Sequence, residues 1–370
     1  MSSAGCFIGL MSGTSLDGVD GVLARCDLPF QVLAHASAPF EAPLRAELQA
    51  LNTPGPNELH RAALAANALV EVYARVVADL LQQTRMSAHE VRAIGAHGQT
   101  VRHQPGRYDG TGYTWQLNQP ALLAERCGID VVADFRSRDV AAGGQGAPLV
   151  PAFHQQVFGR PGQHTAVLNL GGIANLSLLG PAGEVQGFDC GPGNLLMDHW
   201  CHTQTGQAFD QDGRWAASGR VHPALLAHLM DEPFLKQPPP KSTGRDLFNP
   251  VWLNERLHAY AGVPPPDIQA TLTAFTAQSS LQALKTHSPS CQQLIVCGGG
   301  ALNLHLMDQL RGGLTGCEVV ESGAAGLPPL QVEAAAFAWL AHQTVNRQAG
   351  NWPAVTGARG ARVLGAIYPA

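Results

Sequence analysis

A short turn near the start of the chain combines glycines, hydroxyl groups and carboxylates. The turn, Gly13-Thr14-Ser15-Leu16-Asp17-Gly18, lies between two apolar runs at 6–11 and 19–24. Apolar and β-branched residues on both sides of a glycine-bounded turn predict a β-hairpin. Such a turn lines up backbone N–H groups and hydroxyls around an anion, which predicts a phosphate site. A surface hairpin without a ligand is the alternative interpretation.

Two carboxylates beside this turn indicate that a metal shares the phosphate. Val19 and Asp20 stand where a Walker A loop has Lys followed by Ser or Thr, so the turn is not a P-loop. Asp17 and Asp20 instead offer carboxylate oxygens, which with phosphate oxygens are the hard ligands that Mg²⁺ prefers. We therefore expect magnesium near Asp17 or Asp20.

Asp189 is a candidate general base. It ends a strand-like run and is followed by Cys190-Gly191-Pro192-Gly193-Asn194. A carboxylate at the carboxyl end of a strand is expected to project into open space, where general bases are often found. Alternatively, Asp189 caps the following helix through its side-chain oxygen.

His97 and Gln99 form a further polar group, in Gly95-Ala96-His97-Gly98-Gln99-Thr100. They follow a strand-like run and lie between glycines, and such loop positions suit contact with a polar ligand. A loop histidine that is bonded to the backbone is the alternative.

A third glycine-rich turn, Gly298-Gly299-Gly300, follows the strand-like run 294–296 and precedes a helix capped by Asn303. A nucleotide can lie against a helix N-terminus in this setting. With Glu321 the segment comes close to the G-x-G-x-x-G dinucleotide fingerprint, but the third glycine is missing. Its late position favours an adenosine contact in another α/β fold. Close packing of helix on strand is the structural alternative.

The elements that must position these residues alternate between strands and helices. A second glycine-turn hairpin, 165–170 and 173–178, contains Gly171 and Gly172 and echoes the first one. The echo predicts a duplicated α/β architecture whose halves face each other across a cleft. Residues 238–246 are predicted as an ordered loop or hinge. Apolar spacing predicts helices at 57–85, 195–204, 223–230, 250–261, 267–286 and 331–342, and strands at 91–95, 113–117, 129–133, 184–189 and 318–320.

Length and composition bound the possible functions. A chain of 370 residues is long for one hydrophobic core, and we expect an N-terminal domain at 1–129, completed by 345–370, and a C-terminal domain at 130–344. Residues 1–24 contain no Lys or Arg, unlike a signal peptide, and there is no membrane-spanning run, so a cytoplasmic protein without membrane partners is expected. The eight scattered cysteines contain no C-x-x-C and predict reduced thiols.

Charge argues against nucleic acid as a partner. The net charge is −5 and no basic run occurs, whereas nucleic-acid binding depends on Lys and Arg that neutralise phosphates. The chain has only three lysines, Lys236, Lys241 and Lys285. A bound phosphate must therefore be met mainly by backbone N–H groups, arginine and metal.

Taken together and in this order, the motifs resemble those of the anhydro-N-acetylmuramic acid kinases. The likeness spans nearly the whole chain, and several long motifs are more specific than any single glycine turn. The matching segments are 7–20, 96–100 (Ala-His-Gly-Gln-Thr), 134–137 (Asp-Phe-Arg-Ser), 169–175 (Asn-Leu-Gly-Gly-Ile-Ala-Asn), 187–189 (Gly-Phe-Asp), 241–245 (Lys-Ser-Thr-Gly-Arg), 297–300 (Cys-Gly-Gly-Gly) and 353–357 (Pro-Ala-Val-Thr-Gly).

The resemblance implies a fold and a set of site residues. The fold is α/β, with two duplicated ribonuclease-H-like domains of the actin-like ATPase type around a central nucleotide and substrate cleft. The catalytic Asp and the adenosine turn belong to the C-terminal domain. The implied roles are catalytic base for Asp189, ATP phosphate binding with Mg²⁺ for Gly13, Thr14, Ser15, Leu16, Asp17, Gly18, Val19 and Asp20, a second phosphate hairpin at Gly171 and Gly172, adenosine contact at Gly298, Gly299 and Gly300, and sugar binding at Glu333, His97, Gln99 and Arg136.

The resemblance also implies the reaction. Asp189 would activate water to attack the anomeric carbon of the 1,6-anhydro ring while O6 takes the γ-phosphoryl group of ATP. The product is N-acetylmuramic acid 6-phosphate, in peptidoglycan recycling and amino-sugar catabolism, and a homodimer is the implied assembly. Two departures bear on fine sugar contacts: Cys190 replaces a usual Thr, and Leu330-Gln331 replaces the usual Asp-Trp.

Two other functions are compatible with parts of the sequence. One is a non-catalytic, actin-like or chaperone-like ATP-binding module on the same scaffold. The other is a dinucleotide-dependent oxidoreductase built on 298–300 and Glu321, which leaves the two earlier hairpins unexplained.

Overall fold

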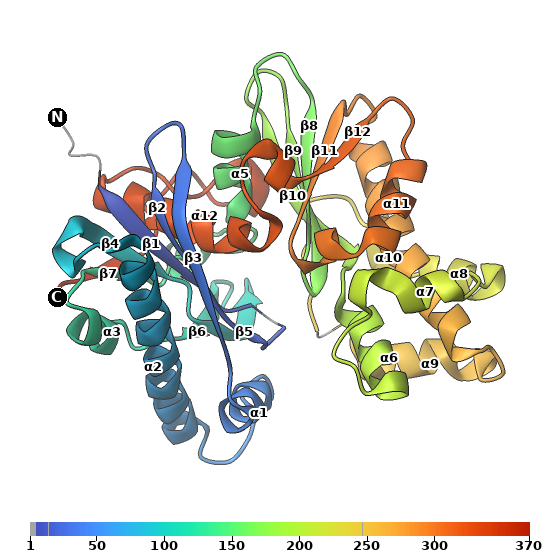
Figure 1. Ribbon diagram of the computed structural model, residues 1–370, viewed down its shortest axis with the longest axis horizontal. Coiled ribbons are helices and arrows are strands. Elements are labelled where there is room, and N and C mark those ends of the chain that lie inside the picture. Colours follow the sequence, from blue (N-terminus) through green and yellow to red (C-terminus); the bar gives the residue numbers. More distant parts are fainter. Residues whose placement is uncertain (1–4, 14, 246) are drawn as a thin grey trace. The chain divides into compact units, whose positions relative to one another are not determined.

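The computed structural model describes residues 5–13, 15–245 and 247–370 (Figure 1). The chain divides into two compact units. Unit 1 comprises Met1–Val157 and Gln331–Ala370, and unit 2 comprises Phe158–Leu330. These boundaries differ from the expected ones at 129/130 and 344/345, because a strand after residue 130 and a helix before residue 345 both pack into the sheet of unit 1.

Unit 1 is built on a mixed sheet with the strand order β13-β7-β4-β1-β2-β3. The first three strands form an antiparallel meander. Strand β4 then lies parallel to β1, β7 lies parallel to β4, and β13 pairs antiparallel at the edge. The strands are β1 (Cys6–Met11), β2 (Gly18–Arg25), β3 (Gln31–Pro39), β4 (Val91–Ala96), β7 (Val131–Ala133) and β13 (Ala366–Tyr368).

Unit 2 repeats this topology with the order β10-β9-β8-β11-β12 (Figure 1). Again three strands form an antiparallel meander, and two further strands add in parallel next to the first of them. The predicted duplication of an α/β architecture is therefore confirmed.

A mixed sheet also removes the basis for a Rossmann-type dinucleotide site at 298–300, because that fold needs a mostly parallel sheet. The strands are β8 (Thr165–Leu170), β9 (Ile173–Leu179), β10 (Val185–Pro192), β11 (Gln293–Cys297) and β12 (Glu318–Glu321).

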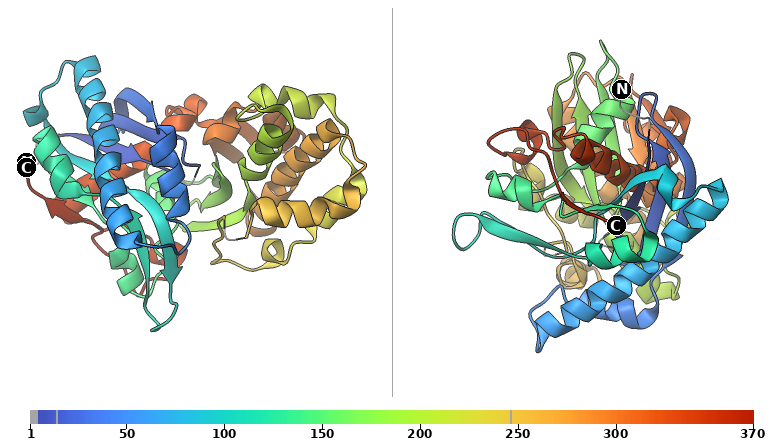
Figure 2. Two further views of the ribbon diagram at one scale, coloured as in Figure 1. Left: turned by 90° about the horizontal axis from the view of Figure 1, so that it is seen from below. Right: turned by 90° about the vertical axis from the view of Figure 1, so that its left-hand side faces the viewer.

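Two helices cover opposite faces of the unit 1 sheet (Figure 2). Helix α12 (Val332–Val345) lies against Gly9, where an added Cβ would come within 1.9 Å of the Ala334 carbonyl oxygen. Helix α2 (Glu58–Thr84) lies against Gly21, where a Cβ would meet Val76. Gly9 pairs with the residue after Gly21, so the two glycines point to opposite faces of the sheet.

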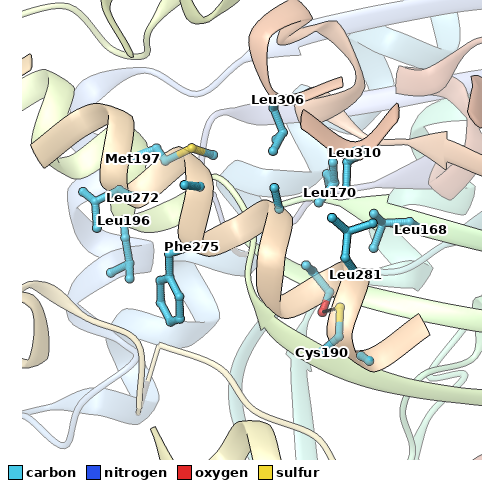
Figure 3. Packing of buried hydrophobic residues seen from close by; sticks show 14 of the residues in the cluster. Leu168, Leu170, Cys190, Leu196, Met197, Leu272, Phe275, Leu281, Leu306 and Leu310 are labelled. Carbon is cyan, nitrogen blue, oxygen red and sulfur yellow. Dashed lines mark hydrogen bonds between the residues drawn. The ribbon is translucent and has the colours of Figure 1, made fainter. Parts of the chain in front are cut away.

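The core of unit 2 surrounds helix α10 (Pro265–His287), whose residues from Ile268 to Leu284 are nearly all buried. Figure 3 shows Leu272, Phe275 and Leu281 of this helix among side chains of the sheet and of the neighbouring helices. A helix that is buried on all sides shows little amphipathic pattern, since both its faces are apolar or hydrogen-bonded. The helices around it are α6 (Leu195–Thr205), α7 (Arg214–Ser218), α8 (Pro223–Met230), α9 (Pro250–Leu257) and α11 (Leu304–Gly312).

Several elements were not predicted or begin and end elsewhere. The predicted helix 250–261 ends at Leu257 and continues as a 3₁₀ turn, His258–Tyr260. No helix among the described residues is both long and apolar enough to cross a membrane. The further elements are α1 (Ala42–Ala50), β5 (Gln99–Pro105), β6 (Gly112–Leu117), α3 (Pro120–Cys127), α4 (Ser137–Ala141), α5 (Val150–Phe158) and α13 (Pro353–Thr356), with 3₁₀ helices η1 (Ala88–Glu90), η2 (Gln211–Gly213), η3 (Pro233–Lys236), η5 (Gly299–Leu302), η6 (Ser322–Ala325) and η7 (Pro329–Gln331).

The contact between α12 and β1 predicts that a side chain at Gly9 lowers the stability of the fold. Because the added Cβ of Gly9→Ala would overlap backbone atoms, the helix must shift away from the sheet. We expect the free energy of unfolding to fall by about 2–3 kcal/mol in urea titrations. Gly262→Ala is the matched control, because a Cβ there meets nothing within 4 Å. Equal stability of the two variants would contradict the close packing of α12.

Candidate functional site

The predicted hairpin turn is anchored by Leu16. Its side chain is 4% exposed and belongs to the core of unit 1, and its N–H bonds to the Gly13 carbonyl at 3.3 Å. Ser15 and Asp17 on either side are exposed. Ser15 and Asp17 therefore face solvent on either side of a buried apolar residue. Thr14, which the sequence assigns to the same phosphate site, lies outside the described residues.

Both carboxylates at this turn lie near a basic side chain. Asp17 lies 3.5 Å from the Arg45 guanidinium, and the two side chains are largely exposed. Asp20, on β2, lies 3.4 Å from Nε2 of His35 on β3. Exposed pairs of this kind are weak, so either carboxylate can exchange its partner for a metal ion. Among the described residues, no cluster of three or more His, Cys, Asp or Glu could hold a metal by itself.

The structure brings His97, Gln99 and Arg136 together with the hairpin turn. Nε of Arg136 donates to Nε2 of His97 at 3.1 Å, and its Nη2 lies 2.9 Å from the same atom. Nε2 of Gln99 donates to the Gly13 carbonyl at 3.2 Å. Oε1 of Gln99 is buried and has no hydrogen-bond partner among the described residues. This part of unit 1 thus contains a guanidinium and an amide oxygen that a polar ligand could use.

His97 is neutral in this arrangement. Burial lowers its pKa well below the ordinary value, and the charge of Arg136 lowers it further. A neutral imidazole that accepts at Nε2 carries its proton on Nδ1. The guanidinium of Arg136 therefore keeps its full positive charge.

A buried hydroxyl pair fixes the turn between His97 and Gln99. Ser12 Oγ donates to the Gly98 carbonyl at 3.1 Å, and the Gly98 N–H donates to the Tyr73 hydroxyl at 3.0 Å. Gly98 has φ +80°, a conformation that favours glycine. Ser12 and Tyr73 were not identified from the sequence, since nothing local in α2 marks Tyr73 as a partner of a loop 25 residues away.

Behind Arg136, the carboxylate of Asp139 is completely buried and fully bonded. Its Oδ2 accepts from the Gly146 N–H at 2.8 Å. Its Oδ1 accepts from Nδ2 of Asn351 at 2.7 Å and from the Thr356 hydroxyl at 2.8 Å. The Gly146 carbonyl in turn accepts from Nη1 of Arg136 at 2.7 Å. Asp139 thereby connects the loop that holds Arg136 to the C-terminal segment.

Glu333 lies in the first turn of α12 and is partly buried. Two glycines of the sheet allow the helix to lie where it does. A Cβ on Gly95 would lie 2.1 Å from the Phe337 carbonyl oxygen, and a Cβ on Gly9 would lie 1.9 Å from the Ala334 carbonyl oxygen. The backbone of β1 and β4 therefore determines where Glu333 stands in unit 1.

In unit 2 the two glycine turns expected to contact nucleotide meet at one end of the sheet. Gly298 has φ +78°, and a Cβ on it would lie 2.5 Å from Oδ1 of Asn169. A Cβ on Gly300 would lie 2.5 Å from Cβ of Leu170. Gly171 and Gly172 follow Leu170 directly, and their carbonyls accept from the Asn194 N–H at 2.8 Å and the Gly193 N–H at 3.0 Å. As predicted, Asn303 caps α11, with Oδ1 accepting from the Leu306 N–H.

Asp189 lies in β10 and pairs with an adjacent loop. Its Oδ2 accepts the Thr243 N–H at 2.8 Å, and its own N–H donates to the Lys241 carbonyl at 3.1 Å. The N-cap of α6 is Asn194, so the alternative in which Asp189 caps this helix is not what the structure contains. A backbone donor to a carboxylate oxygen favours its charged form and fixes its direction.

Comparison with known proteins places the chain in a family. The family model for anhydro-N-acetylmuramic acid kinase matches residues 5–370. The chain belongs to this family. Curated relatives with that name include the proteins of Variovorax paradoxus (strain S110), 64% identical over 98% of this chain and 99% of the relative, and of Albidiferax ferrireducens, 60% identical with the same coverage. The Bordetella petrii relative is 59% identical over 98% of this chain and 96% of its own length.

The departure at Cys190 from the usual pattern of these kinases concerns the core. The thiol of Cys190, a residue labelled in Figure 3, contacts the Ala174 carbonyl at 3.3 Å and the Ser280 hydroxyl at 3.7 Å. Burial raises its pKa to about 12, so the thiol is uncharged and unreactive at neutral pH. Cys190 therefore packs between β9 and α10, and the register irregularity of β10 lies at this residue.

The Asp139 network predicts that an isosteric change destabilises unit 1. In Asp139→Asn an amide NH₂ must face either the Gly146 N–H or the two donors at Oδ1, which leaves donors unpaired. We expect a loss of about 2 kcal/mol in the free energy of unfolding, measured by urea titration. Asp308→Asn, on the surface of α11, serves as the control and is expected to change little. Two equal curves would contradict a structural role for Asp139.

The neutral state of His97 predicts acid sensitivity. A histidine in the unfolded chain titrates at about pH 6.5. Below that pH the unfolded state binds a proton that folded His97 rejects, so the free energy of unfolding falls as pH falls toward the lowered folded pKa. We expect His97→Gln to remove up to about 1.4 kcal/mol per pH unit of this dependence. His60→Gln, at an exposed position, is the control, and an unchanged slope in His97→Gln would contradict the prediction.

Proposed function

We propose that the chain uses ATP and water to convert anhydro-N-acetylmuramic acid to N-acetylmuramic acid 6-phosphate. Membership of the kinase family over nearly the whole chain supports the reaction class. The observation that carries the chemistry is the Asp189 carboxylate, oriented by the Thr243 N–H at 2.8 Å. A non-catalytic ATP-binding module leaves this family identity unexplained.

Asp189 acts as the general base. It accepts a proton from water as the water oxygen bonds to the anomeric carbon. As that bond forms, the bond between this carbon and O6 breaks, O6 bonds to the γ-phosphorus, and ADP leaves. Because the ring opening supplies the nucleophilic oxygen, the transfer needs chiefly positioning and charge neutralisation. A base of this kind contributes typically about 10²- to 10⁴-fold to the rate.

Backbone turns carry the phosphates and the adenosine. The exposed Ser15 and the glycines of the first turn can contact the ATP phosphates directly. Leu16 and Val19 are buried, so they contribute backbone groups or hold the turn on the core. Mg²⁺ binds phosphate with one or two carboxylates and keeps several waters, so Asp17 or Asp20 fits it without a larger cluster. When bound, the metal neutralises phosphate charge. Gly171 and Gly172 form the second phosphate turn. The adenosine contacts Gly298, Gly299 and Gly300, a turn that packs closely against Leu170.

The sugar is held by groups of unit 1. The charged guanidinium of Arg136 and the unpaired Oε1 of Gln99 supply a donor set and an acceptor for a polar ligand. His97 orients Arg136, and Glu333 contributes a carboxylate from α12. We place the reaction in peptidoglycan recycling and amino-sugar catabolism, in the cytoplasm where ATP is present, and the active form is a homodimer.

Substitution of Asp189 tests the assignment. We expect Asp189→Asn to lower sugar-dependent ADP release by about 10²-fold or more, because the amide cannot take the proton from water. ATP binding, measured by calorimetry, is expected to stay within about twofold of the unmodified protein. Asp308→Asn is the control for a surface carboxylate.

Two outcomes contradict different parts of the proposal. Turnover that survives Asp189→Asn rejects the base. If the folded, unmodified protein releases no ADP in response to the sugar in the presence of Mg²⁺, the function itself is rejected.

A further inference from the structure

Lys241 is buried although it carries a charge. Only 9% of the residue is exposed, whereas Lys236 and Lys285 are exposed on the surface. Its Nζ donates to the carbonyls of Phe234 at 3.1 Å and Leu235 at 3.0 Å, and it lies 4.8 Å from the centre of the Phe234 ring. Burying an ammonium group is costly unless its donors are satisfied, so this side chain has a defined position.

The segment that begins at Lys241 also holds the catalytic base. The Lys241 carbonyl accepts the Asp189 N–H, and two residues later the Thr243 N–H donates to the Asp189 carboxylate. Both bonds come from one three-residue stretch that runs beside β10. The position of this stretch relative to Asp189 therefore contributes to the orientation of the carboxylate.

The carbonyls that receive the Lys241 ammonium are themselves fixed. They belong to η3, whose N-cap Glu232 accepts from the Phe234 N–H at 3.3 Å. The other oxygen of Glu232 accepts from Nε1 of Trp252 at 3.0 Å and from Nη2 of Arg256 at 3.1 Å, both on α9. Lys241 thus connects the 241–243 stretch to η3, which Glu232 in turn connects to α9.

We propose that Lys241 is a positioning residue for the reaction: its ammonium holds the 241–243 stretch so that the Thr243 N–H orients the Asp189 carboxylate toward water. It acts through the backbone and touches neither sugar nor nucleotide. The inference rests on the proposed role of Asp189 as the base. A lysine that serves only fold stability is the competing explanation, and the two differ in what they do to kcat.

The test is steady-state kinetics of Lys241→Met. This change removes charge and donors, keeps an unbranched side chain of similar length, and takes a donor away from the Phe234 and Leu235 carbonyls. We expect kcat to fall about 10- to 100-fold, with KM for ATP and for the sugar within about threefold. The lost hydrogen bonds lower the melting temperature by a few degrees only, so the variant stays folded at the assay temperature. Lys236→Met is the matched control and is expected to keep the full kcat. Lys236 is exposed and belongs to η3, the 3₁₀ helix whose carbonyls receive the Lys241 ammonium.

Two further variants separate positioning from stability. Lys241→Arg restores donors and charge and is expected to recover most of the lost kcat. In the double variant of Lys241→Met and Asp189→Glu, kcat is expected to fall by much less than the product of the fold losses of the two single variants. Both changes misplace the same carboxylate, so their effects are not independent. Fully multiplied losses would overturn the proposal.

Failure of this inference can be told apart from failure of the proposed function. Should Asp189→Asn abolish turnover while Lys241→Met keeps the normal kcat, only the role of Lys241 is overturned. The same holds if Lys241→Met lowers the melting temperature or raises KM and leaves kcat intact. Turnover that survives Asp189→Asn would instead reject the base, and with it the ground for a positioning lysine.

Discussion

The candidate site depends on close approach of backbone to backbone at a few glycines. Helix α12 can lie on β1 and β4 only because Gly9 and Gly95 have no side chain, and α12 carries Glu333. In unit 2, a Cβ on Gly193 would lie 2.2 Å from the Gly171 carbonyl oxygen, and Gly298 fits against Leu170 in the same way. Contacts at this density leave no room for adjustment, so the functional segments have one position within each unit.

The sequence predicted the elements whose signals are local. The β1–β2 and β8–β9 hairpins combine apolar strands with glycine turns, and both were recognised together with the duplication. Strand β5 was missed because it is mostly polar and, within the described part of the chain, pairs with β6 alone. The unit boundaries also came out differently, since α12 and β13 join a sheet whose first strand is more than 300 residues earlier.

Among the site residues, single positions were predictable and their partners were not. Asp189 stands out before a glycine-rich stretch, although β10 continues past it to Pro192, and His97 stands out between glycines. That Arg136 donates to His97, 39 residues away, or that Asp139 accepts from Thr356, 217 residues away, has no local signal. Lys241 begins a motif that the sequence already marked, but only the fold reveals that Asp139 and Lys241 are buried and hydrogen-bonded.

The discontinuous composition of unit 1 has a consequence for synthesis on the ribosome. Unit 2 is one continuous segment, whereas unit 1 needs Gln331–Ala370 for its helix α12 and its edge strand β13. Domains generally fold as units while the chain emerges. All residues of unit 2 are therefore made before unit 1 is complete. Until Gln331–Ala370 is made, the face of the unit 1 sheet that α12 covers at Gly9 stays exposed. The residues translated first complete their fold last.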